Sequence, residues 1–388
     1  MRLIVTLSLA VACVTCADTQ VFRGSYVLRD SAGIQIVEVE RPEVAPTERW
    51  TVSPAPLIEF GQNAPADVIL YRVRGATQLG NGQFVVANGG AYQLQWYDAA
   101  GQLLRTAGRE GGGPGEFSAL NWIVRHGADS VMVLDSRLQR LSVFDAAGRF
   151  IRAIAVDVWG NRHGTFSDGS VLIAQNRYGG EGLVRQQVAL WRVDPGDGHR
   201  DSLGAYEGEE QLVERQGNMV LLRPAPFGRE GVFAVRGLHV LVGDQGAYQV
   251  REYSLDRDLI RLFRVEEPAR SVTANDIAAL REQLIAEFRG TNIDAWRRTV
   301  EEQSYPDVLP AHGAMVVDAV ERVWIQDYPR PGSTIVDWWI FDRDWRPVGA
   351  TRLPTAFEVY EIGEEYVLGK WSDSLDVEHV GMYGLSPP

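Results

Sequence analysis

One pattern of residues recurs along this chain. The segment FVVANGGAYQLQWYDAAGQLLR at 84–105 returns in register as VMVLDSRLQRLSVFDAAGRFIR at 131–152. A third copy, VLVGDQGAYQVREYSLDRDLIR, occupies 240–261. A unit that reappears in register is typical of folds assembled from repeated supersecondary elements, so we expect the chain to be built from such units.

Each copy predicts a small antiparallel sheet, because short apolar runs alternate with turn-forming Gly, Asn and Asp. The first strand of the 84–105 segment ends at Asn88, and five other strands match it. Those five end at Asp135, Gln175, Asp244, Asp327 and Lys370. Four short strands per unit is the pattern of a β-propeller blade. We therefore predict an all-β fold, a six-bladed β-propeller over residues 56–388.

The last unit has no room for a fourth strand, since only three residues follow EHVGMYGL at 378–385. The segment PLIEFG at 56–61 precedes the first unit as LLRTAG at 103–108 precedes the second. We expect this N-terminal strand to complete the C-terminal blade and close the ring. Within the N-terminal segment 18–55, the alternating run at 34–40 is expected either beside that same blade or across the outside of the ring.

Residues 268–313 interrupt the β pattern. Thr273 and Asp276 have capping-box spacing, and apolar residues follow at helical spacing as far as Phe288. We predict a helix here and a second one over 292–303. This α-helical insertion follows an outer strand, so it should partly cover one mouth of the central channel. The alternative is a packing decoration on the rim.

The first seventeen residues differ from the rest. The apolar run at 3–14 is too short for a membrane-spanning helix and suits a secretory signal. The tetrapeptide AVAC at 10–13 is similar to a bacterial lipobox, which would make Cys13 the lipidated residue; cleavage after Ala17 is the alternative. Cys13 and Cys16 are the two cysteines, so the mature body can form no internal disulfide. We expect an exported protein, either a lipoprotein of the periplasm or cell envelope or a secreted one.

Charge limits the choice of partners. The chain has 38 Lys and Arg against 51 Asp and Glu, a net charge of −13. Nucleic-acid binding needs concentrated positive charge, so we expect no nucleic-acid partner. We expect a monomer that touches a membrane only through a lipid anchor.

The glycine run at 111–115 is not a phosphate-binding loop, because no helix and no Lys follow it. It predicts a tight turn between blades, with Phe117 packed between them. Together with the repeat, GREGGGPGEF at 108–117 resembles the NHL-type six-bladed propellers. RDSAG at 29–33 is similar to bacterial exported or lipoprotein-like members of unassigned function. The resemblance covers about residues 29–388. It implies the fold but does not identify an activity, since such propellers include RNA-binding modules, scaffolds, an amidating lyase and lactonases.

The six repeat positions Asn88, Asp135, Gln175, Asp244, Asp327 and Lys370 form the main candidate site, because equivalent positions on a ring face a common axis. Their oxygens would suit a hard cation such as Ca²⁺, or the hydroxyls of a sugar or lactone. The alternative is structural: Asp or Asn at a strand end commonly caps the next turn. Lys370 departs from the pattern and would repel a cation if it points toward the axis.

Other candidate residues give weaker signals. The six histidines show no zinc-type spacing, and His312, near the covered mouth, is expected in a solvated loop. Trp338 and Trp339 should point to opposite faces of a strand, where both pack in cores or one is exposed to a partner.

Two functions remain open. The first is an exported or lipid-anchored, non-enzymatic binding or scaffold module for a protein, peptide or glycan. The second is a metal-assisted lactonase or another hydrolase, with oxygen ligands around the central channel. No motif assigns a catalytic residue.

Overall fold

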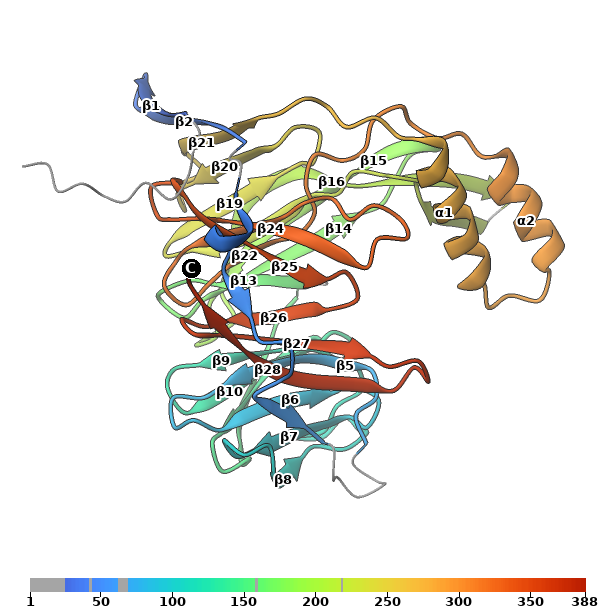
Figure 1. Ribbon diagram of the computed structural model, residues 1–388. Coiled ribbons are helices and arrows are strands. Elements are labelled where there is room, and N and C mark those ends of the chain that lie inside the picture. Colours follow the sequence, from blue (N-terminus) through green and yellow to red (C-terminus); the bar gives the residue numbers. More distant parts are fainter. Residues whose placement is uncertain (1–24, 42–43, 62–68, 158–159, 218) are drawn as a thin grey trace, which may run out of the picture.

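The computed structural model describes residues 25–41, 44–61, 69–157, 160–217 and 219–388 (Figure 1). The predicted signal segment 1–17, with Cys13 and Cys16, lies outside this part of the chain. The described residues form a mostly β structure of six sheets. Among them, no helix is both long and apolar enough to cross a membrane.

Three of these sheets have the four antiparallel strands predicted for a blade. The first contains β5 (Val73–Gln78), β6 (Phe84–Asn88), β7 (Gln93–Tyr97) and β8 (Leu103–Ala107). The second contains β9 (Leu120–His126), β10 (Ser130–Asp135), β11 (Arg140–Asp145) and β12 (Phe150–Ala155). The fifth contains β22 (Met315–Val317), β23 (Val323–Gln326), β24 (Ile335–Phe341) and β25 (Pro347–Pro354).

The third sheet is larger than predicted. It contains β13 (Asn161–Thr165), β14 (Val171–Arg177), β15 (Gly182–Val193), β16 (Arg200–Gln216) and β17 (Met219–Pro224). Strands β15 and β16 have 12 and 17 residues, and their hairpin extends toward the two helices (Figure 1).

The fourth sheet corrects one expectation. Its core strands are β18 (Val232–Arg236), β19 (His239–Gly243), β20 (Gln249–Tyr253) and β21 (Leu259–Glu266). Strand β2 (Ile34–Glu40) pairs in parallel with β21, and β1 (Tyr26–Ser31) pairs with β2. Of the two positions expected for residues 34–40, the one beside the C-terminal sheet was therefore wrong. Alternation predicts a strand, but nothing local to it selects which sheet edge it meets.

The sixth sheet joins the two ends of the chain. It contains β26 (Glu358–Ile362), β27 (Tyr366–Ser372) and β28 (Glu378–Ser386). Both β3 (Thr51–Val52) and β4 (Ile58–Phe60) pair antiparallel to β28. A 3₁₀ turn at Pro46–Glu48 precedes β3.

The sheets surround a common channel. A cavity of about 680 Å³ is lined by residues of β5, β9, β13, β18, β22 and β26, each of which is an edge strand of a different sheet. Sheets that meet at one edge strand each and pack face to face have the architecture of a β-propeller.

The glycine-rich turn packs as the sequence predicted. Phe117 is fully buried in a core shared by the first and second sheets, and its ring lies 5.8 Å from that of Phe144. Gly108 has a φ of +95°, and a Cβ there would lie only 2.5 Å from the Phe117 ring. The turn therefore needs glycine at this position.

The two predicted helices are present. They are α1 (Ala274–Ala286) and α2 (Ile293–Glu302). The capping box forms as expected, because Thr273 Oγ1 accepts from the Asp276 N–H at 3.2 Å and the Asp276 carboxylate accepts from the Thr273 N–H at 2.9 Å. Arg330 lies 2.6 Å from Asp276 and attaches the start of α1 to the loop after β23.

The inter-sheet position of Phe117 can be tested by truncation. Phe117→Ala should lower the free energy of unfolding by about 3–5 kcal/mol, because it leaves a cavity between two sheets. Leu104→Ala, at a side chain that is 46% exposed, should change it by less than about 0.5 kcal/mol. Denaturant unfolding of both variants measures the difference, and equal effects would contradict this packing.

Candidate functional site

Two of the six repeat positions are fully buried, and their side chains bind backbone groups. The Asn88 side chain accepts from the Tyr71 N–H at 3.2 Å and donates to the Ile69 carbonyl at 2.8 Å. The Asp135 carboxylate accepts four backbone N–H bonds, from Ser118, Ala119, Arg137 and Leu138, at 2.6 to 3.1 Å. The bonds from Arg137 and Leu138 cap the turn after β10, as the structural alternative describes. Asn88 instead binds the segment before β5 and not the turn that follows β6.

Gln175 and Lys370 also have local partners. Gln175 Oε1 accepts from Trp191 Nε1 at 3.1 Å. Lys370 Nζ lies 3.0 Å from Glu378 and 3.1 Å from Glu358. Burial lowers the pKa of Lys370, but the bonds to these two carboxylates outweigh burial, and the net change is upward.

Asp244 and Asp327 contact charged side chains. Asp244 accepts from the Gly246 N–H at 2.9 Å and lies 3.4 Å from Arg251. Asp327 forms an ion pair with Arg41, which follows β2, and accepts from Trp339 Nε1 at 3.2 Å.

In the described ranges, no three His, Cys, Asp or Glu side chains are grouped as a metal site would need. A ligand role for the six repeat positions, including one for Ca²⁺, stays a prediction.

His312 is not in a solvated loop, as the sequence suggested, but fully buried. Its Nδ1 lies 2.9 Å from the Gly313 carbonyl, its ring centroid lies 5.5 Å from that of Tyr248, and burial lowers its pKa. The ring occupies space beside Gly243, where an added Cβ would lie 2.9 Å from His312 Cε1. The burial of His312 depends on Gly243, which is distant in the sequence. The residues next to His312 therefore do not reveal it.

The two adjacent tryptophans of β24 point to opposite faces, as alternation requires. Trp338 packs in the core between the fifth and sixth sheets, and Trp339 packs in the core between the fourth and fifth. Both are buried, so the alternative of an exposed tryptophan that contacts a partner was wrong.

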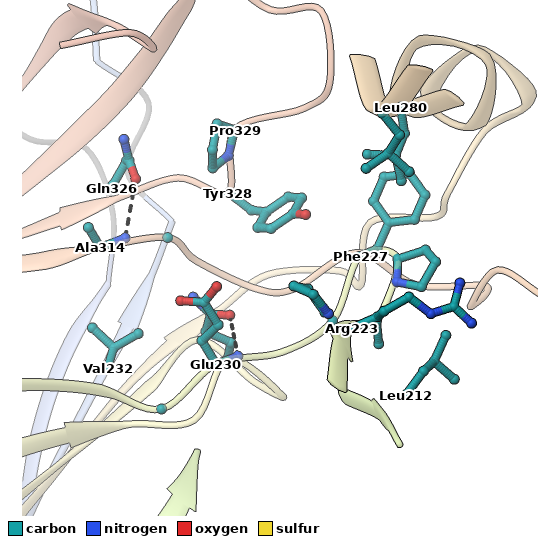
Figure 2. Close-up of a pocket in the computed structure, with 18 of the residues that line it drawn as sticks. Leu212, Arg223, Phe227, Glu230, Val232, Leu280, Ala314, Gln326, Tyr328 and Pro329 are labelled. Carbon is teal, nitrogen blue, oxygen red and sulfur yellow. Dashed lines mark hydrogen bonds between the residues drawn. The ribbon is translucent and has the colours of Figure 1, made fainter. Parts of the chain in front are cut away.

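The insertion, the β16–β17 hairpin and the loop after β23 enclose a second cavity, which we call the mouth cavity (Figure 2). Its volume is about 630 Å³. His163, Phe233 and Met315 line both this cavity and the central channel. The mouth cavity therefore adjoins the channel, and the insertion contributes to its wall.

Apolar side chains form the wall on the helical side. Leu280 and Leu284 come from α1 and Trp296 from α2, while Phe227 lies opposite them after β17. Trp296 Nε1 donates to the Leu284 carbonyl at 2.9 Å, and its ring stacks on Phe288 at 5.5 Å. These contacts hold the indole in place, so this wall is preorganised.

Glu230 is the main polar group of the mouth cavity. Its backbone N–H donates to Gln245 Oε1 at 2.8 Å, and its carboxylate is exposed to the cavity (Figure 2). In the part of the chain that is described, this carboxylate takes part in no hydrogen bond or ion pair. Partial removal from water raises the pKa of Glu230. The negative charge of Glu209 adds to this increase, and the positive charge of Arg185 opposes it.

Tyr328 lies near Glu230 on the loop after β23 (Figure 2). Burial raises the pKa of Tyr328 to about 12, and the negative charges of Glu230 and Asp276 add to this effect. The phenol therefore stays protonated at neutral pH and can donate a hydrogen bond.

Sequence reasoning missed Phe227, Glu230 and Tyr328, because none of them belongs to the repeat. The one signal that pointed here was the predicted position of the insertion over the mouth of the channel.

No known family model matches the chain, and no curated protein does either. Solved structures share its fold. A Bacteroides vulgatus member of the DUF4221 family matches with a TM-score of 0.54 at 11% identity, over 87% of this chain and 98% of that one. A Bacteroides fragilis protein described as a predicted exported protein matches with a TM-score of 0.50 at 11% identity, over 90% and 98%. At this identity the likeness concerns the fold alone.

The capping role of Asp135 predicts a stability effect. Asp135→Ala leaves buried N–H groups without an acceptor and should lower the free energy of unfolding by about 3 kcal/mol or more. Asp129→Ala, at an exposed turn residue, should have little effect. Calcium should raise the melting temperature of neither the natural protein nor the variant. A rise that is lost in Asp135→Ala would indicate a cation site instead.

Glu230 predicts a pH-dependent effect of its own. The pKa of Glu230 is higher in the folded state than in the unfolded state. Above the folded-state pKa, ionisation of Glu230 therefore lowers the free energy of unfolding. This loss of stability is absent below the ordinary pKa of a glutamate, where the side chain is protonated in both states. Glu230→Gln should therefore raise the denaturant midpoint at pH 7 and leave it unchanged at pH 4. Glu282→Gln, on the exposed side of α1, serves as the control and should show no such difference. Loss of stability in Glu230→Gln at pH 7 would contradict this account.

Proposed function

We propose that this protein is an exported, NHL-type six-bladed β-propeller that binds a peptide or an exposed protein segment at the mouth cavity, without catalysis. The observation that carries the proposal is the cavity itself. Its volume of about 630 Å³ is in the range of ligand sites, and it combines an apolar wall with a few polar groups.

The polar groups at the mouth suit recognition. Glu230 and Tyr328 offer a carboxylate and a phenol near the apolar side chains of Phe227 and Leu280 (Figure 2). Apolar side chains of a peptide would enter the wall formed by α1 and α2, and its polar groups would meet these two residues. Such a division between apolar area and a few orienting polar groups is typical of binding pockets.

The repeat positions support binding over metal-assisted hydrolysis. A hydrolase of that kind would use several oxygen atoms converging on one ion. Here the Asp135 oxygens accept backbone N–H bonds, and the Asp327 carboxylate meets Arg41 and Trp339. These contacts serve the turns and the packing of the propeller.

Export of this chain is part of the proposal. The apolar run at 3–14 supports it, as does the fold shared with the Bacteroides fragilis protein described as a predicted exported protein. We propose Cys13 as the site of lipidation, with cleavage after Ala17 as the alternative.

Substitutions on two sides of α1 test the binding site. Leu280→Glu places a charge in the apolar wall and should weaken peptide binding at least about tenfold, whereas Ala278→Glu, at an exposed position of the same helix, should not. Binding of the labelled full-length protein to peptide and glycan arrays measures this. Equal binding by both variants would contradict the mouth cavity as the binding site. Binding to glycans alone would contradict a peptide as the ligand.

A further inference from the structure

Strand β17 is the last strand of the third sheet. It pairs with β16 from Gln216↔Met219 to Gln211↔Pro224. Among the strands that the structure describes, none pairs with its other side. The backbone of β17 thus presents a free edge.

The hydrogen-bond pattern shows which groups face outward. The Ala225 N–H donates to the Glu210 carbonyl at 2.9 Å, so these two residues occupy a hydrogen-bonded position of the ladder. In an antiparallel pair, bonded and non-bonded positions alternate. The N–H and C=O groups of Val220 and Leu222 therefore point away from β16, together with the C=O of Pro224.

This edge lacks the usual protection against pairing. Edge strands commonly carry Lys, Pro or a bulge, which discourage an incoming strand. Here Met219, Val220 and Leu222 are 60%, 44% and 39% exposed, and the proline occurs only at the last position, 224. The outward donors and acceptors are thus flanked by exposed apolar side chains.

The free edge leads into the mouth cavity. Arg223 and Pro224 of β17 line that cavity, as do Phe227 and Glu230 beyond it (Figure 2). Arg223 already forms an ion pair with Glu214. Among the described residues, none forms a hydrogen bond or an ion pair with the Glu230 carboxylate, although Arg185 acts on it electrostatically. A cationic group on a ligand would complement this carboxylate.

We infer that the ligand is an extended peptide with apolar side chains, which adds as a strand to the edge of β17 and places a Lys or Arg side chain or an N-terminal ammonium at Glu230. This inference rests on the proposed function and names its ligand class. Strand addition provides main-chain hydrogen bonds, while the mouth cavity provides selectivity for side chains and charge.

A phage-displayed library of random dodecapeptides, selected on the full-length protein, tests the inference. Selected peptides should alternate apolar residues and carry a basic group. Leu222→Pro removes an outward N–H and no bond within the sheet, so it should weaken binding at least about tenfold without unfolding the protein. Leu222→Thr, which keeps the N–H, should retain most of the affinity, and circular dichroism checks that both variants are folded.

Charge is tested on the same peptides. Glu230→Gln should weaken binding several-fold, and replacing the basic residue of the peptide by Gln should remove that difference. Equal affinity of Glu230→Gln and the natural protein for the selected peptides would overturn the cationic part of the inference.

The outcomes separate this inference from the proposed function. Binding that Leu280→Glu abolishes but Leu222→Pro leaves intact keeps the mouth cavity as the site and overturns strand addition. A library that yields no binder contradicts both. A dimer in solution that Leu222→Pro converts to a monomer, with no peptide bound, would assign the edge to a second copy of this chain.

Discussion

The structure depends on sheets that bury both of their faces. Alternate side chains of β6 enter two different cores: Val85 and Ala87 pack toward the second sheet, and Phe84 and Val86 pack with the sixth. The same division applies to the adjacent Trp338 and Trp339 of β24. A sheet with two apolar faces needs a neighbour on each side, and a ring of such sheets provides one for every face.

This arrangement limits what the repeat residues can do. Each strand that leaves the channel must reverse in a short turn, and the turn needs acceptors for its backbone N–H groups. Asp135 supplies four such bonds, and Asn88 binds the backbone on both sides of its amide. The side-chain oxygens of these two residues are thus occupied by backbone groups of the fold.

The departures from the repeat come together at one mouth of the channel. Helix α1, helix α2 and the long β15–β16 hairpin are additions to the repeat. Side chains of α1, α2 and β16 line the same cavity. The free edge of β17 ends beside this cavity. The packed sheets thus carry a cavity lined partly by these additions and partly by residues of the sheets and their loops.

The sequence alone determined the all-β repeat, the capping box of α1 and the packing of Phe117, because each depends on residues close in the chain or on a pattern repeated many times. Of the six predicted strand ends, those at Asn88 and Asp135 are confirmed, whereas the other four strands end one or two residues away. The sequence did not determine the partner of β2, the burial of His312 or the grouping of Glu230 with Tyr328 and the insertion. Those depend on residues about 30 to 230 positions apart along the chain. Only the tertiary structure, which fixes where the sheets meet and which edges stay free, decided them.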